Sequence, residues 1–496
     1  MTHLGNFDVI VIGGGINGAG IARDAAGRGL SVMLVEKGDL AEGTSSRSGK
    51  LIHGGLRYLE YYEFRLVREA LIEREVLLKA APHIVWPMRF VLPHSPEQRP
   101  AWLVQLGLFL YDHLGGRQKL PASRKINLRT EPEGVAIQDK YTKAFEYSDC
   151  WVDDARLVVL NAIAAKEQGA KILTRTEAVS ARREGNQWQV VFKNEKGQGL
   201  NANAKALVNA AGPWVEDVIN GVVGSNTLRR VRLVKGSHII VPKFWEGPQA
   251  YLFQNTDKRV IFVNPYEVDK CLIGTTDIPY HGRPQDATID ESEITYLLNA
   301  VNRYTKKQLQ RSDVLSSFSG VRPLYDDSAD NPSAVTRDYV FDLEGIPPLL
   351  SIFGGKITTY RKLAKHALQK LRPFFLDMKT DWTAQATLPG GDMKAADFES
   401  FLNGFKSSNP WLPAELSKHY ARLYGTCAEQ LIYSASSLAD LGIQFAPNLY
   451  EAEIKYLREN EWAITAEDIL QRRTKHGLHM SKEEIQNLEK WLIQNV

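Results

Sequence analysis

The stretch FDVIVIGGGINGAGIARDAAGRGLSVMLVE, from Phe7 to Glu36, decides the fold of this chain. Phe7 to Ile12 are apolar on both faces and end at glycines, which is typical of a buried parallel strand. Ile16 to Arg28 favours a helix, and Ser31 to Glu36 favours a second strand. The stretch therefore predicts a right-handed strand–helix–strand unit.

Gly13, Gly15 and Gly18 have the GxGxxG spacing, with Gly14 inside the same turn. The first glycine allows a tight turn, the second lets backbone approach a pyrophosphate, and the third lets the helix pack on the strand. Glu36 ends the second strand, where its carboxylate can accept from both ribose hydroxyls and would repel a 2′-phosphate. The motif predicts a dinucleotide site that disfavours NADP, and leaves FAD and NAD open.

Composition narrows the class of protein. The 496 residues are 44% hydrophobic, enough for two or three domains, and 61 basic against 58 acidic side chains give no footprint for nucleic acid. Cys150, Cys271 and Cys427 are too far apart for a metal or CxxC pattern, which fits a reducing compartment. We expect no signal peptide and no spanning helix of about 20 apolar residues, so any membrane contact is peripheral or monotopic.

The pattern changes twice along the chain. Tyr61 to Ala81 has a helical period, and beyond Ile172 four short apolar runs predict a second, antiparallel sheet: Trp188–Phe192, His238–Val241, Val260–Val263 and Cys271–Thr275. An apolar strand returns at Leu349 to Phe353, followed by a helix at Ile357 to Leu371. After Pro389-Gly390-Gly391 the pattern is helical and strand-poor. We expect interleaved subdomains over residues 1–388 and a helical domain over residues 389–496.

Two loops carry further candidate cofactor residues. Thr44, Ser45 and Ser46 follow the second strand, where small hydroxyl side chains can donate to a diphosphate. Gly54 and Gly55 would let backbone lie against a flat ring. An ordinary Ser/Gly loop is the alternative interpretation.

Nine motifs in sequence order resemble the FAD-dependent glycerol-3-phosphate dehydrogenases, a branch of the amino-acid-oxidase-like flavoproteins. They are GGGINGAGIARDAAGRGLSV, TSSRSGKLIHGGLRYLEYYEFRLVREAL, EYSDCWVDDARLV, LVNAAGPWV, VKGSHIIVP, IGTTDIPY, SGVRPLYDD, FGGKITTYRKLA and HYARLYG. Together they are specific and span nearly the whole chain. Arg47 and Gly49 depart from the pattern, since the family would place smaller or hydroxyl residues there.

The resemblance implies an α/β fold with a Rossmann-like FAD-binding domain, an antiparallel-sheet substrate domain and a helical C-terminal domain. It implies oxidation of sn-glycerol 3-phosphate to dihydroxyacetone phosphate, with electrons passed through FAD to ubiquinone or menaquinone. It also implies a place on the cytoplasmic face of the inner membrane, and allows a homodimer. The alternatives are an oxidase that uses oxygen, an amine or amino-acid oxidase, and a binding module with structural FAD.

Alcohol oxidation needs a base for the hydroxyl proton and donors for the distal phosphate. Arg57, Arg322 and Lys356 match positions that line the family's substrate pocket, and Gly354 and Gly355 precede this lysine as candidate flavin contacts. We count Arg322 and Lys356 also among the catalytic candidates.

Two histidines compete for the role of base. His53 adjoins the presumed flavin loop, and the family's oxidase branch has a histidine in that role. His238 lies in a strand that borders the pocket. We favour His53.

A short hydrophobic segment, Ala101 to Leu114, is the predicted membrane contact. As a helix it places Trp102, Leu103, Leu106, Phe109 and Leu110 on one side. Two basic clusters could meet anionic lipid: Arg117, Lys119, Arg124 and Lys125, and in the tail Arg472, Arg473 and Lys475.

The neighbouring carboxylates Asp153-Asp154 and Asp326-Asp327 are not interpreted as catalytic pairs. Adjacent residues point in different directions on a strand or helix.

Overall fold

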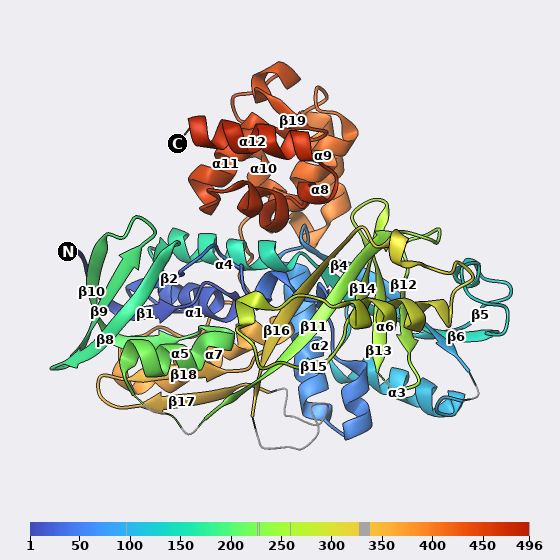
Figure 1. Cartoon of the computed structure of the whole chain (residues 1–496), viewed down its shortest axis with the longest axis horizontal. Coiled ribbons are helices and arrows are strands. Elements are labelled where there is room, and N and C mark those ends of the chain that lie inside the picture. Colours follow the sequence, from blue (N-terminus) through green and yellow to red (C-terminus); the bar gives the residue numbers. More distant parts are fainter. Residues whose placement is uncertain (96, 226, 228, 258, 327–337, 496) are drawn as a thin grey trace.

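The computed structural model describes residues 1–495 except 96, 226, 228, 258 and 327–337. Two sheets lie side by side, and the C-terminal helices form a separate body above them (Figure 1). A Rossmann-like sheet, a mainly antiparallel sheet and a helical C-terminal domain confirm the predicted fold class.

The first sheet has eight strands and contains the predicted strand–helix–strand unit. Strands β18, β10, β1, β2 and β7 run parallel, with β17 antiparallel at the β18 edge. Val9 and Val11 of β1 pack in the core that includes α1, α4 and α7, whereas Ile10 and Ile12 pack in the core on the other face. Burial on both faces explains the unbroken apolar run. The strands are β1 (Thr2–Ile12), β2 (Val32–Val35), β7 (Lys171–Leu173), β8 (Thr176–Glu184), β9 (Gln187–Asn194), β10 (Gly199–Asn209), β17 (Val340–Glu344) and β18 (Leu349–Phe353).

One predicted strand belongs to the other sheet. Trp188–Phe192, assigned from the sequence to the antiparallel sheet, lies in β9, which pairs with β10 of the first sheet. Trp188, Val190 and Phe192 are buried in the same core as Ile10. The alternating pattern identifies a strand, but the pairing partner is set by which apolar surface that strand covers.

The second sheet has ten strands in the order β15-β11-β14-β13-β12-β4-β6-β3, with β16 paired to β11 and β5 to β6. All its pairs are antiparallel except β12 with β4. The other three predicted strands lie here, in β11, β13 and β14. The strands are β3 (Leu51–Ile52), β4 (Val85–His94), β5 (Arg124–Asn127), β6 (Lys143–Val152), β11 (Val231–Pro242), β12 (Ala250–Gln254), β13 (Val260–Tyr266), β14 (Lys270–Gly274), β15 (Ile278–Pro279) and β16 (Ser316–Tyr325).

Four helices of the two-sheet region, α1, α2, α3 and α7, lie close to their predicted positions, whereas α4, α5 and α6 were not predicted. The segment predicted as helical from Tyr61 begins with a 3-10 turn, and its α-helix starts at Phe64. The helices are α1 (Ile16–Gly27), α2 (Phe64–Ala80), α3 (Ala101–Leu114), α4 (Asp154–Glu167), α5 (Val215–Asp217), α6 (Glu291–Asn302) and α7 (Tyr360–Leu371).

The C-terminal body has its own hydrophobic core. Leu416, Tyr420, Ile454, Leu457 and Leu488 are buried together. Its helices are α8 (Phe398–Ser408), α9 (Ala414–Tyr424), α10 (Ala428–Leu431), α11 (Glu451–Glu461) and α12 (Lys482–Gln494), with a small hairpin of β19 (Gln444–Ala446) and β20 (Leu449–Tyr450). The domain boundary after residue 388 stays a prediction.

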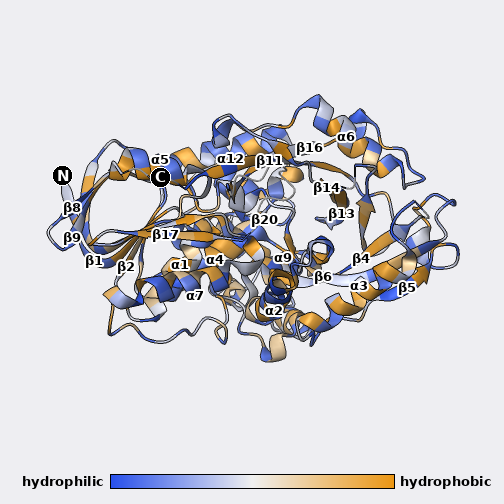
Figure 2. Ribbon diagram, turned by 90° about the horizontal axis from the view of Figure 1, so that it is seen from below, coloured by the Kyte–Doolittle hydropathy of each residue, from blue (hydrophilic) through white to orange (hydrophobic). Residues whose placement is uncertain are grey.

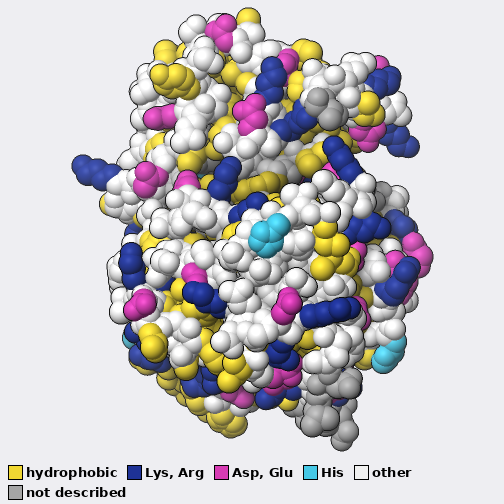
Figure 3. Space-filling model, turned by 90° about the vertical axis from the view of Figure 1, so that its left-hand side faces the viewer, with side chains coloured by type: hydrophobic (Ala, Val, Ile, Leu, Met, Phe, Trp, Pro, Cys, Tyr) yellow, Lys and Arg dark blue, Asp and Glu magenta, His cyan; other side chains and the backbone are white. Residues whose placement is uncertain are grey.

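Three large hydrophobic side chains of α3, Trp102, Leu106 and Phe109, are exposed. Figure 2 shows α3 as a largely hydrophobic helix at the rim, where Trp102 is 66% and Phe109 56% exposed. On the face seen in Figure 3, acidic and basic side chains are interspersed, as the small net charge leads one to expect. Among the described residues, no helix has both the length and the apolarity needed to cross a bilayer.

Candidate active site

The turn between β1 and α1 requires glycine at two positions. Gly13 has a φ of +112°, and a Cβ there would lie 2.6 Å from the carbonyl oxygen of Ala210. A Cβ on Gly18 would lie 1.9 Å from the carbonyl oxygen of Gly13, so any side chain would push the helix off the turn. The N-terminus of α1 thereby lies close to the strand ends, where its N–H groups favour an anion.

Glu36 follows β2 and faces the same turn. Its Oε2 accepts the N–H of Gly14 at 2.7 Å, and its Oε1 accepts the N–H of Gly38 at 2.8 Å. Burial raises the pKa of Glu36, and the two N–H donors oppose that shift. Each carboxylate oxygen keeps a second acceptor site, which suits contact with the hydroxyls of a ribose.

The serine loop is held in place by its own hydroxyl groups. Thr44 donates to the carbonyl of Val321 at 2.6 Å, and the Ser45 hydroxyl accepts the N–H of Ile16 at 3.0 Å, at the start of α1. Ser48 and Lys50 both bind the buried carboxylate of Asp154. The loop therefore connects α1, β16 and α4.

One cavity of about 1750 Å³ runs from the glycine turn to the second sheet. Pockets for drug-sized ligands are on the order of 300–1,000 Å³, so this one has room for a dinucleotide and a small substrate. Of the described residues, Gly14, Gly18 and Ser46 of the predicted set are not on its wall. The predicted residues that line it are Gly13, Gly15, Glu36, Thr44, Ser45, His53, Gly54, Gly55, Arg57, His238, Arg322, Gly354, Gly355 and Lys356.

Arg322 of β16 is oriented by two neighbours that the sequence analysis missed. Its Nη1 donates to Asp277 at 3.0 Å, and its Nη2 donates to the hydroxyl of Thr275 at 3.0 Å. Its Nη2 also donates to the carbonyl of Thr276 at 3.3 Å, so the guanidinium is held from one segment on the cavity wall. Asp277 and Thr275 both lie in the motif IGTTDIPY, but the motif does not reveal which side chain faces Arg322.

Arg57 and Lys356 reach the same cavity from different segments. The Lys356 ammonium lies 4.2 Å from the ring centroid of Tyr58, a cation–π contact, and Arg57 donates to the hydroxyl of Tyr61 at 3.4 Å. The fold therefore brings three cations from three distant parts of the chain to one cavity.

His238 of β11 is buried and stacks on Phe318 with ring centroids 4.9 Å apart. Burial lowers its pKa to about 3, and the nearby cations Arg322 and Lys50 add to the shift. The imidazole is therefore neutral at physiological pH. Its Nδ1 has no hydrogen-bond partner among the described residues.

His53 follows β3 and is less buried than His238. Its backbone N–H donates to the Thr358 hydroxyl at 3.3 Å, and its ring meets the edge of Phe262 with centroids 6.0 Å apart. Both candidate bases thus line the cavity, and their positions alone do not separate them.

A buried network connects α3 to the paired glycines after His53. The N–H of Gly54 donates to the hydroxyl of Tyr111, which donates to Asp149 at 2.8 Å. Arg74 of α2 pairs with the same carboxylate at 2.7 Å. The inner face of the helix that exposes Trp102 is therefore bonded to a loop on the cavity wall.

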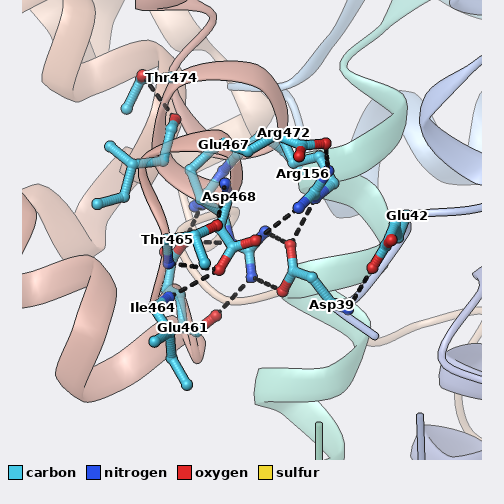
Figure 4. A network of polar contacts seen from close by, with 12 residues as sticks. Asp39, Glu42, Arg156, Glu461, Ile464, Thr465, Glu467, Asp468, Arg472 and Thr474 are labelled. Carbon is cyan, nitrogen blue, oxygen red and sulfur yellow. Dashed lines mark hydrogen bonds and ion pairs between the residues drawn. The ribbon is translucent and has the colours of Figure 1, made fainter. Parts of the chain in front are cut away.

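The predicted basic cluster in the tail does not face solvent, which corrects the sequence interpretation. Arg473 is fully buried and binds Asp39 with two bonds of 2.7 and 2.8 Å, and Arg472 reaches the same carboxylate at 2.6 Å. Lys475 is buried against Asp153. Figure 4 shows Asp39 facing Arg472 across the junction between the C-terminal domain and the first sheet. Asp39 and Asp153 lie more than 300 residues away from these side chains in the sequence, so the sequence alone does not reveal this pairing.

The neighbouring carboxylates have separate partners, as expected. Asp153 accepts the N–H of Arg156 and binds Lys475, whereas Asp154 binds Ser48 and Lys50. Asp326 pairs with Arg232, and Asp327 lies outside the described residues.

Residues 8–361 match the family described as FAD dependent oxidoreductase, and residues 382–492 match the C-terminal domain of alpha-glycerophosphate oxidase. The D-erythritol 1-phosphate dehydrogenase of Brucella abortus is 64% identical over 98% of this chain and 97% of its own length. The aerobic glycerol-3-phosphate dehydrogenase of Escherichia coli is 51% identical over the same shares. The glycerol-3-phosphate dehydrogenase of Bacillus halodurans, solved with FAD, has a TM-score of 0.75 at 26% identity, covering 99% of this chain and 94% of its own.

The chain therefore belongs to the FAD dependent oxidoreductase family, in the branch that includes the FAD-dependent glycerol-3-phosphate dehydrogenases. FAD is its cofactor. The glycine turn, the acceptor sites of Glu36 and the long cavity fit this dinucleotide.

Arg473→Leu tests the junction between the domains. The substitution leaves the Asp39 carboxylate buried with one partner fewer, which costs about 3–5 kcal/mol of unfolding free energy. Because Asp39 lies three residues after Glu36, we also expect weaker FAD binding. Denaturant unfolding and FAD titration of the apoprotein measure the two effects.

The control is Arg303→Ala, which removes a partly exposed pair with Glu97 and should change neither quantity noticeably. Equal stability of Arg473→Leu and the wild type would contradict the role of the Arg473–Asp39 pair in stabilising the junction between the domains.

Proposed function

We propose that this chain oxidises the secondary alcohol of a short polyol phosphate and passes the electrons through FAD to a membrane quinone, ubiquinone or menaquinone. The observation that carries the proposal is that Arg57, Arg322, Lys356 and two histidines line the cavity that also contains the dinucleotide turn. Bound FAD supplies the hydride acceptor. The chain's own residues bind the phosphate, hold the alcohol and take its proton.

The three cations suit a phosphate dianion. The arginines offer pairs of N–H donors, and Lys356 acts as a point charge. Asp277 and Thr275 hold Arg322 in one orientation, and this preorganisation lowers the entropy lost on binding. A carboxylate substrate would need less positive charge, so the set favours phosphate over an amino acid.

For the base we propose His53, with His238 as the neutral neighbour that helps to position the alcohol. A neutral, buried imidazole can accept or donate one hydrogen bond without a change of charge. His238 meets this condition because burial and two nearby cations hold its pKa near 3.

Two substrates are candidates, sn-glycerol 3-phosphate and D-erythritol 1-phosphate. The relatives named for the first are 51–53% identical to this chain, and the relative named for the second is 64% identical. Gly49 favours the larger substrate. Of the described atoms, only His238 Nε2 lies within 4 Å of a Cβ built on Gly49, at 3.5 Å. A hydroxyl residue there would fill space beside the histidine that the glycine leaves open for another carbon.

A quinone acceptor needs an apolar path to the cavity, and α3 supports one. Leu103, Leu106 and Leu110 lie on the cavity wall, while Trp102, Leu106 and Phe109 are exposed. The predicted lipid-facing side of the helix is thus continuous with the cavity rim. The basic residues near it contribute less than the sequence suggests, because Arg124 pairs with Glu131, Glu133 and Glu146.

Anaerobic addition of each substrate to the FAD-loaded protein tests the proposal. Bleaching of the flavin absorbance by either polyol phosphate supports it, and bleaching by neither contradicts it. We expect Gly49→Ser to lower kcat/KM for D-erythritol 1-phosphate, by an amount that corresponds to about 1–3 kcal/mol of lost transition-state stabilisation. The reason is that an added side chain beside His238 crowds the extra carbon. The value for sn-glycerol 3-phosphate should change little.

Lys356→Ala is the contrasting variant. Loss of a phosphate partner should weaken the binding of both substrates alike, by about 2–5 kcal/mol. A Gly49→Ser variant that affects both substrates equally would refute the role of Gly49. Peroxide formation as fast as dye reduction would identify an oxidase instead.

The two histidines separate in the pH dependence of flavin reduction. His238 stays neutral across pH 5–8, since its pKa is about 3, so its protonation gives no loss of rate in that range. We therefore expect any loss of rate on acidification within this range to persist in His238→Ala. His53→Ala should reduce flavin slowly with a modest change in substrate affinity.

Stopped-flow reduction across this pH range measures both effects. Slow, pH-independent reduction in His238→Ala, with normal behaviour of His53→Ala, would reverse the two roles.

Trp102→Glu with Phe109→Glu tests the membrane surface. Two charges on the exposed face of α3 should release the protein from vesicles that contain anionic lipid and lower quinone reduction, while dye reduction stays intact. The matched control is Val268→Glu with Leu376→Glu, two residues that are each 84% exposed. Vesicle flotation measures membrane binding, and quinone assays measure electron transfer to the acceptor. Retained binding by the α3 variant would exclude this helix as the anchor.

A further inference from the structure

Two histidines and a glutamate meet inside the C-terminal domain, away from the cavity. His419 lies on α9, Glu453 on α11, and His476 just after the segment that holds Arg472 and Arg473. One possible ligand atom from each lies within 4.8 Å of those of the other two. The Glu453 side chain is fully buried, His476 is 8% exposed, and the His419 side chain 15%.

The hydrogen bonds in this cluster leave two buried atoms without partners. Glu453 Oε1 is bonded twice, to His419 Nε2 at 2.8 Å and to the Tyr424 hydroxyl at 2.7 Å. Glu453 Oε2 and His476 Nε2 have no partner among the described residues. Buried polar atoms without partners are rare because each costs free energy. Two such acceptor atoms in one cluster therefore indicate a bound group.

The surroundings of His476 suit a cation. A hydrogen bond with the backbone of Asn448 holds the imidazole ring. Its Nε2 has no partner among the described residues and is available as a ligand atom.

We propose that His419, Glu453 and His476 bind one Zn²⁺ ion. Two imidazoles and one carboxylate are a common zinc donor set, and zinc adapts to a tetrahedral site with one further ligand. The Tyr424 hydroxyl and the Asn448 backbone then orient the ligands from outside, as partners of ligands do in metal sites.

Such an ion would stabilise the junction with the flavin domain. It joins α9 and α11 to His476, three residues after Arg473, which binds Asp39. Zinc would therefore fix the segment that holds the two domains together. This role is independent of the proposed substrate and of the flavin chemistry.

The test uses the untagged, FAD-loaded full chain, stripped with a chelator and titrated with Zn²⁺ or Co²⁺. We expect one equivalent to bind, with the visible absorption of tetrahedral Co²⁺, and an unfolding temperature that rises when zinc is added. His476→Gln and Glu453→Gln should weaken binding at least about tenfold, since even partners outside the ligand shell are worth that much. His281→Gln, which changes an exposed histidine, should bind like the wild type.

The wild-type titration decides even if a variant fails to fold. No stoichiometric binding by the stripped wild type, or an octahedral Co²⁺ spectrum typical of adventitious sites, would overturn the proposal. Equal binding by the wild type and a folded His476→Gln, as judged by FAD content and circular dichroism, would overturn it as well.

Discussion

The salt bridges between Asp39 and the two arginines Arg472 and Arg473 are the interaction on which the junction between domains depends. Asp39 is 1% exposed and Arg473 is fully buried, so neither charge could stay there without the other. The carboxylate lies in the loop after β2, three residues beyond Glu36. A contact that orders the C-terminal domain therefore also orders the loop beside the nucleotide turn (Figure 4).

The cavity of the candidate active site follows from a second constraint, the close approach of backbone at the glycine turn. Because Gly13 and Gly18 carry no side chain, α1 begins directly at the ends of the parallel strands. The antiparallel sheet then closes the other side and supplies His238, Arg322 and Asp277 from β11, β16 and the loop after β14. The dinucleotide turn and the residues that we propose for the substrate thus belong to different sheets. The proposed chemistry takes place at the border between these sheets.

Much of the site could be predicted because its residues lie in motifs with a local cause. The glycine spacing, Glu36 and the strand–helix–strand unit depend on backbone geometry within about 30 residues, and His53, His238, Arg322 and Lys356 all line the cavity. Asp277 and Thr275 could not be predicted, since they reach Arg322 only because β11 pairs with β16 on one side and with β14 and β15 on the other. The strand at Trp188 was recognised but assigned to the wrong sheet for a similar reason.

By itself the sequence determined the nucleotide-binding unit and the class of fold, and it supplied the three cations that we propose as phosphate ligands, because these depend on local spacing and residue type. Tertiary structure alone decided which charges are free. Arg472, Arg473 and Lys475 look like a lipid-binding cluster, yet Asp39 and Asp153 bury and neutralise them. The sequence predicts the apolar side of α3 as a membrane contact, but only the structure shows that Trp102, Leu106 and Phe109 are exposed. The physical reason is that burial and ion pairing are set by neighbours in space, and those neighbours come from segments hundreds of residues apart.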